Sequence, residues 1–218
     1  LYAICDGHSG PDTAKFASIM LCDLFEEKIN FSHHMSLEEI ELIFKKTEDE
    51  LKGLELPDGS TLCLAYIQSN EVNKKRKSTT AHLGDKRAII IRSDGKVRVL
   101  TKDHKTTIRS EFERIRDEFG KLTQDNRIDG ILGVSRAMGD FGINGVGRQP
   151  ELNEFEIDDE NDRFLVIGCD GVFDVLTSEL VAEVAYRAKT PNEAAFIIRN
   201  AAFGSDSTDN ISAIVVDL

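Results

Sequence analysis

The sequence predicts an α+β fold in which two antiparallel β-sheets stack on each other and helices flank both outer faces. Three observations lead to this prediction. Strand-like segments outnumber helical ones, the strands come in consecutive runs joined by turns, and the longest helices come in successive pairs. With 218 residues, 40% of them hydrophobic, residues 1–218 are expected to form a single domain with a sizeable core.

The N-terminal quarter predicts one strand followed by two helices. The apolar run from Leu1 to Cys5 reads as a strand that stops on Asp6-Gly7-His8. Apolar residues at helical spacing then predict a helix from Pro11 to about Ile29. Ser36, three residues before Glu39, forms a capping box that opens the second helix. The polar linker between the helices, with His33-His34, is expected to be a surface loop.

The middle of the chain changes to the two-residue period of strands. Asp94-Gly95 lies between two apolar runs and predicts a hairpin turn. The lysine-rich stretch from Asn70 to Ser78 is expected to be a solvated hairpin loop. The predicted strands are 61–67, 79–83, 87–92 and 97–100.

The C-terminal half returns to mixed structure. Its strongest strand signal is the apolar run from Arg163 to Cys169, which ends on Asp170-Gly171. Residues 141–150 are glycine-rich, which is typical of a mobile loop at an active site and equally of a plain surface connection. The other expected elements are helices over 106–119, 178–188 and from 190 onward, and strands over 128–133 and 211–218.

The composition limits the classes of function that we expect for this chain. The net charge of −12 argues against nucleic-acid binding, which needs a basic face. No apolar run approaches the roughly 20 residues of a membrane span. The four cysteines are widely spaced and are expected to be buried free thiols in a reducing compartment, which places the protein in the cytoplasm or nucleus. We expect a monomer.

Four aspartates stand where an apolar strand meets a turn. Taken singly, each Asp-Gly pair is first of all a turn dipeptide, and the chain has five of them. Carboxylates at strand ends can nevertheless converge at one end of a sandwich, where a cation would relieve their mutual repulsion. Oxygen ligands favour hard ions such as Mg²⁺ or Mn²⁺. The pattern therefore predicts a divalent metal site at Asp6, Asp85, Asp170 and Asp209.

An ordered set of short motifs extends over essentially the whole chain. In this order it resembles the metal-dependent protein phosphatases of type 2C, the PPM family, whose fold is a β-sandwich flanked by pairs of helices. The resemblance thus agrees with the fold expected from the residues. The motifs are Asp6-Gly7-His8-Ser9-Gly10, Gly59-Ser60-Thr61, Gly84-Asp85-Lys86-Arg87, Leu100-Thr101-Lys102-Asp103-His104, Glu113-Arg114-Ile115, Ser135-Arg136-Ala137-Met138-Gly139-Asp140, Cys169-Asp170-Gly171-Val172-Phe173-Asp174 and Asp209-Asn210-Ile211-Ser212.

This resemblance implies hydrolysis of phosphoserine and phosphothreonine in phosphoproteins by water activated between two Mn²⁺ or Mg²⁺ ions. Asp6 matches the aspartate that bridges the ions, and Gly7 matches the residue that offers its carbonyl oxygen. His8 matches the proposed general acid. The remaining matches are carboxylate ligands of the second ion at Asp170 and Asp209, and positions associated with a third, weaker ion at Asp85 and Asp174.

The sequence also departs from the family pattern. Lys86 stands where serine is common, Ser9 stands where glycine is common, and residues 141–150 lack the usual lysine. The family's earlier strand, with a phosphate-binding arginine and a Glu-Asp pair, is expected to lie outside this sequence. Two alternatives remain: an inactive pseudophosphatase that serves as an interaction module, and an acidic calcium-binding domain.

Three further residues or pairs have structural interpretations. His82 is expected on a sheet face or in the core. His104 is expected to order a turn rather than bind metal. Arg136 and Asp140 are expected to form a structural pair near the site, with Asp140 also able to touch a metal-bound water.

Overall fold

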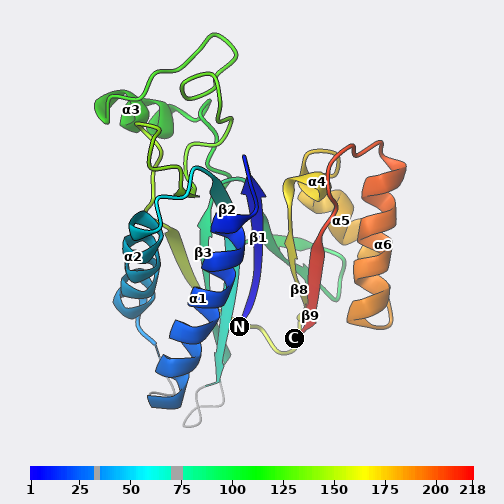
Figure 1. The fold of residues 1–218 in the computed structure, drawn as a ribbon. Coiled ribbons are helices and arrows are strands. Elements are labelled where there is room, and N and C mark those ends of the chain that lie inside the picture. The colour runs from blue at the N-terminus through cyan, green and yellow to red at the C-terminus, as the bar shows by residue number, and fades with distance from the viewer. Residues whose placement is uncertain (32–34, 70–75) are drawn as a thin grey trace.

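A computed structural model describes residues 1–31, 35–69 and 76–218. It shows two stacked antiparallel sheets with helices against both outer faces, which confirms the predicted α+β sandwich (Figure 1). His33-His34 and most of the connection after Asn70 lie outside the described residues.

The first sheet has the order β1-β2-β3-β7, with the short β6 paired to the start of β2. Its strands are β1 (Tyr2–His8), β2 (Gly59–Ser69), β3 (Arg76–Leu83), β6 (Met138–Gly139) and β7 (Glu151–Glu156). The second sheet has the order β5-β4-β8-β9. Its strands are β4 (Arg87–Arg92), β5 (Val97–Val99), β8 (Asp162–Gly168) and β9 (Ala213–Asp217).

The helices form an outer layer on each side. On the first sheet lie α1 (Asp12–Phe31) and α2 (Leu37–Gly53), and α2 begins with the predicted capping box of Ser36 and Glu39. On the second sheet lie α4 (Asp170–Phe173), α5 (Ser178–Ala185) and α6 (Pro191–Gly204). None of the helices in the described part of the chain combines the length and apolar character needed to cross a membrane.

Strand alternation explains why the core has three layers. Because successive side chains of a strand point to opposite faces, Leu62 and Leu64 of β2 pack under α1 and α2, whereas Cys63 and Ala65 face the other sheet. In β4, Ile90 likewise faces the first sheet, while its neighbours face α5 and α6. The strands β2 and β4 are therefore apolar on both faces.

One region stands apart from this sandwich. The short helix α3 (Arg109–Asp117) and its flanking loops sit beyond one end of the sheets, above α2 in Figure 1. They pack around a small core of their own that contains Ile115, Ile128 and Val146. This is also the end at which β1 finishes and α4 begins.

Some of the expectations from the sequence were wrong. Residues 128–133 form only isolated bridges and turns, because Ile128 pairs locally with Leu122 and Leu132 instead of with a sheet strand. Within the helix expected over 106–119, Ile115 is buried, whereas Phe112 and Phe119 are exposed. Cys22 is exposed on α1 rather than buried, although all four cysteines are free.

Candidate functional site

Strand register brings three separate loops to the same end of the sandwich. β1 ends with Asp6, Gly7 and His8, and its alternation puts Asp6 and His8 on one face of the strand. Arg87 at the start of β4 pairs with Gly168 at the end of β8. The β3–β4 turn, with Asp85 and Lys86, therefore lies beside the start of α4.

The carboxylates at this end converge on one cation, the ammonium group of Lys86. Its Nζ lies 2.8 Å from Oδ2 of Asp170, 3.0 Å from Oδ2 of Asp6 and 3.2 Å from Oδ1 of Asp85. The Lys86 side chain is only 2% exposed, whereas those of Asp6 and Asp170 are 32% and 22% exposed. The lysine thus approaches from inside the protein, and the carboxylates of Asp6 and Asp170 face outward to solvent.

The charges in this cluster support one another. Burial opposes the charged form of Lys86, but the three neighbouring carboxylates outweigh it and raise the pKa of the ammonium. Asp170 is also partly desolvated, yet the hydrogen bond from Lys86 lowers its pKa. Asp85 is the most buried of the three, and burial raises its pKa despite Lys86. Lys86 therefore carries its positive charge at neutral pH.

The other predicted ligands lie near this cluster without joining it. Asp209 and Asn210 pass directly over Gly171, where a Cβ would come within 2.1 Å of the Asn210 carbonyl oxygen and 3.5 Å of the Asp209 Cβ. Asp209 itself is exposed and accepts the Asn210 N–H at 2.7 Å. Asp174 follows one turn after Asp170 and pairs with Lys105 at 3.2 Å. Asp209 thus lies against the start of α4, and Asp174 lies at its end.

The donor set fits a divalent ion. Oxygen atoms of Asp6 and Asp170 lie within 4.8 Å of each other, together with the sulfur of Cys169. That sulfur is already engaged, since it donates to the Asn210 carbonyl oxygen and accepts the Ser212 N–H. The groups free to face an ion are thus hard oxygens, and the Lys86 ammonium shows that they can be satisfied by a cation.

His8 contacts Asp140, which the sequence analysis expected to pair with Arg136. Its Nε2 lies 2.6 Å from Oδ2 of Asp140, whose side chain is almost fully buried. The two residues meet over Gly59, where a Cβ would come within 2.5 Å of both side chains. The predicted pairing of Arg136 with Asp140 was wrong, because Arg136 binds Glu111 instead.

The 141–150 segment anchors Asp140. The Arg148 guanidinium donates hydrogen bonds to the carbonyl oxygens of Gly139, Asp140 and Val146. Val146 is buried in the small core around α3. These contacts connect the glycine-rich segment to the backbone of the residue that holds His8.

Sequence reasoning missed two buried glutamates, Glu48 beside Gly139 and Glu111 beside Ser135. Glu48 of α2 approaches the Gly139 N–H at 3.5 Å, and burial raises the pKa of its carboxyl to about 7. Burial alone would raise the pKa of Glu111 as well, but hydrogen bonds from Arg136, Ser135 and Arg114 lower it to about 2. The spacing of three residues between Glu111 and Arg114 on a predicted helix was the available signal.

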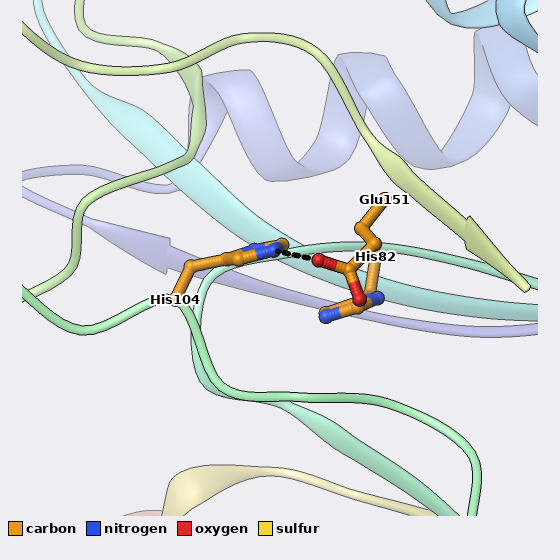
Figure 2. Close-up of side chains that lie close together, drawn as sticks. All are labelled: His82, His104 and Glu151. Atoms are coloured by element: carbon orange, nitrogen blue, oxygen red, sulfur yellow. Dashed lines mark hydrogen bonds and ion pairs between the residues drawn. The ribbon is translucent and has the colours of Figure 1, made fainter. Parts of the chain in front are cut away.

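A second cluster contains His82, His104 and Glu151 (Figure 2). The two imidazole rings stack in parallel, with centroids 4.4 Å apart. The Gly84 N–H donates to Nδ1 of His104, so the proton of this neutral ring is on Nε2, which donates to Oε2 of Glu151 at 3.2 Å. Both nitrogens of His104 are thus occupied, which is unlike a metal ligand.

The histidine cluster has a structural role. Burial lowers the pKa of His104 to about 4 and also lowers that of His82, so both rings are neutral at pH 7. His104 also donates its backbone N–H to the Gly84 carbonyl oxygen. The prediction that His104 orders a turn is confirmed, and that turn is the one that presents Asp85 and Lys86.

Comparison with known proteins identifies relatives of this chain. The sequence profile of the family described as "Protein phosphatase 2C" matches residues 1–211. A curated relative, "Protein phosphatase 2C homolog 1" of Schizosaccharomyces pombe, is 31% identical over 99% of this chain and 63% of its own length. The Saccharomyces cerevisiae protein of the same name is 29% identical over 100% of this chain and 81% of its own.

Solved structures support the same fold. A chain described as "Crystal structure of a phosphatase from a pathogenic strain Toxoplasma gondii" superposes with a TM-score of 0.83 at 22% identity, over 99% of this chain and 85% of that one. Several curated relatives are considerably longer than this chain, which spans 63% of the S. pombe protein. The profile match and the sandwich together establish that the chain belongs to the protein phosphatase 2C family, type 2C of the PPM phosphatases.

Proposed function

We propose that this protein is a metal-dependent serine/threonine phosphatase that acts on phosphoproteins. The observation that supports this best is the convergence of Asp6, Asp85 and Asp170 on one cation position, with the His8–Asp140 pair at the same end of the sandwich. Family membership supports the reaction class. The partly exposed carboxylates leave the site open to a large phosphoprotein.

In this proposal the aspartates hold two Mn²⁺ or Mg²⁺ ions, with Asp6 shared between them and Asp170 and Asp209 on one. Bound ions of this kind supply an activated water near neutral pH and offset the negative charge of the phosphoryl oxygens. Asp85 and Asp174 border the same space and are proposed for a third, weaker ion. Gly7 lies between Asp6 and His8 in β1, paired with Ser60, and is proposed to offer its carbonyl oxygen.

His8 is proposed to protonate the leaving seryl or threonyl oxygen. An alkoxide is a poor leaving group, so a proton donor in reach of it accelerates the reaction. Because Nε2 of His8 is bonded to Asp140, the nitrogen left to meet the substrate is Nδ1. Asp140 fixes the orientation of the ring, and Arg148 fixes the backbone of Asp140.

The remaining expectations become proposals of the same kind: a monomer that works in the cytoplasm or nucleus. All four cysteines are free, which is in line with a reducing compartment. Within the described residues, no observation favours an inactive interaction module or a calcium-binding domain. An inactive module would be expected to have lost the carboxylates of the metal site. Asp6, Asp85 and Asp170 are present together at one end of the sandwich.

The test is hydrolysis of a phosphothreonine peptide by the full-length protein with Mn²⁺ and with EDTA. Asp170→Ala is expected to lower kcat at least about 100-fold, because it removes a charge that neutralises and positions the ions. Asp94→Ala is the matched control, since Asp94 also precedes a glycine but lies in an exposed hairpin turn. Full activity of Asp170→Ala, or full activity in EDTA, would refute the proposal.

A further inference from the structure

Lys86 has no role in the proposed mechanism. Its side chain is 2% exposed and ends among the carboxylates of Asp6, Asp85 and Asp170. A buried lysine is normally costly, and here three carboxylates repay that cost. Lys86 is also one of the positions at which the sequence departs from the family pattern, where serine is common.

The ammonium contacts the same oxygen atoms that would bind an ion. Mg²⁺ lies about 2.0–2.1 Å from its oxygen ligands. An ion bound to Oδ2 of Asp6 and Oδ2 of Asp170 would therefore sit beside an Nζ that is 3.0 Å and 2.8 Å from those same atoms. Two cations cannot share these two oxygens at such short range without strong repulsion.

The lysine has a place to go when an ion enters. Its third partner, Oδ1 of Asp85, belongs to the preceding residue and lies 3.2 Å away. Asp85 is more buried than Asp6 or Asp170 and is thus the carboxylate least accessible to an ion from solvent. A swing of the ammonium toward Asp85 would free Asp6 and Asp170 while keeping the lysine paired.

We propose that Lys86 is a built-in competitor for the divalent cations of the site. In the metal-free protein it neutralises the carboxylates and holds them together. An incoming ion must displace it from Asp6 and Asp170, so the metal affinity is lower than the carboxylates alone would give. This inference rests on the proposed metal site, but it is tested by binding and not by turnover.

The first experiment is calorimetric titration of the full-length protein with MnCl₂, without substrate. Lys86→Met keeps the length of the side chain and removes its charge. Lys96→Met changes the net charge by the same amount, but Lys96 is exposed and pairs with Asp94 away from the site. Lys86→Met is expected to bind Mn²⁺ at least tenfold more tightly than the wild type, with Lys96→Met within twofold of the wild type.

A second measurement uses the unaltered protein and so does not depend on a variant that folds. In the ¹⁵N-lysine NMR spectrum, the buried ammonium of Lys86 should give a solvent-protected signal without metal. Saturating Mg²⁺ should shift this signal or remove its protection.

The outcomes separate this inference from the proposed function. Equal Mn²⁺ affinity of wild type and Lys86→Met, or a Lys86 signal unchanged by saturating Mg²⁺, would overturn the competition while leaving the metal site intact. Weaker binding by Lys86→Met would also overturn it. If neither protein bound Mn²⁺, the competition and the metal-dependent phosphatase would both fall.

Discussion

The buried carboxyl of Glu48 is expected to make the stability of the fold depend on pH. Glu48 is 8% exposed, and its Oε1 has no hydrogen-bond partner among the residues that the structure describes. Burial raises its pKa from 4.5 to about 7, and this outweighs the opposing effects of the Gly139 N–H and Arg148. Folding therefore favours the protonated carboxyl, and the folded protein binds more protons than the unfolded chain between pH 4.5 and 7.

The direction and size of this change in stability with pH follow from proton linkage. Because the folded pKa is the higher one, stability falls as pH rises from 4.5 to 7 and levels off above that range. Each unit of pKa difference is worth about 1.4 kcal/mol, so ionising Glu48 costs the fold about 3 kcal/mol at pH 8. Glu48→Gln removes this titratable group. The unfolding free energy of the variant relative to wild type should therefore be about 3 kcal/mol higher at pH 8 than at pH 4.5.

The assay is urea denaturation of both proteins at pH 4.5 and pH 8. Glu50→Gln is the matched control, because Glu50 lies on the same helix and is exposed. The difference in unfolding free energy between Glu48→Gln and wild type should change by about 3 kcal/mol between the two pH values. A difference that is the same at both, or that follows Glu50→Gln, would refute the reasoning.

Three other predictions concern the site and the core. Asp140→Asn should lower kcat by about 10²-fold with little change in KM, because His8 loses the carboxylate that orients it; steady-state kinetics on a phosphopeptide checks this. Gly171→Ala should cost about 1–3 kcal/mol in denaturant unfolding, since its Cβ would meet the Asn210 carbonyl oxygen. Phe25→Ala should cost about 3–5 kcal/mol by the same assay, because Phe25 is fully buried under α2.

Each of the three has a control in the chain. Asp158→Asn changes a partly exposed aspartate that pairs with Arg92, and it should leave kcat unchanged. Gly204→Ala adds a Cβ that meets nothing within 4 Å and should not destabilise the protein. Phe196→Ala removes a ring that is 60% exposed and should cost less than about 0.5 kcal/mol. Equal effects at a site and its control would contradict the assignment concerned.

The sequence was sufficient for the elements with strong local signals. The continuous apolar run of β8, the capping box of α2 and the start of α6 at Thr190 lie where expected, because these elements depend on neighbouring residues. The junction aspartates were found for the same reason: each stands where an apolar run of the sequence meets a turn. Their convergence could be expected from the fold, and the structure brings Asp6, Asp85 and Asp170 together.

The sequence was insufficient where a feature depends on distant partners. The strand β7 (Glu151–Glu156) is polar along much of its length and exists because it pairs with β3 at the sheet edge. The His8–Asp140 pair joins residues 132 positions apart. The burial of Glu48 depends on Gly139, and no local pattern marks a glutamate on α2 for burial. Tertiary packing decides all three.

The central claim is that the aspartates at this end of the sandwich hold divalent ions. Anomalous diffraction at the manganese edge, from crystals of the full-length protein soaked in MnCl₂, tests it most directly. The account predicts peaks within about 2.2 Å of carboxylate oxygens of Asp6 and Asp170, with the Lys86 ammonium moved away from them. Manganese bound only elsewhere, with Lys86 still on both aspartates, would contradict it.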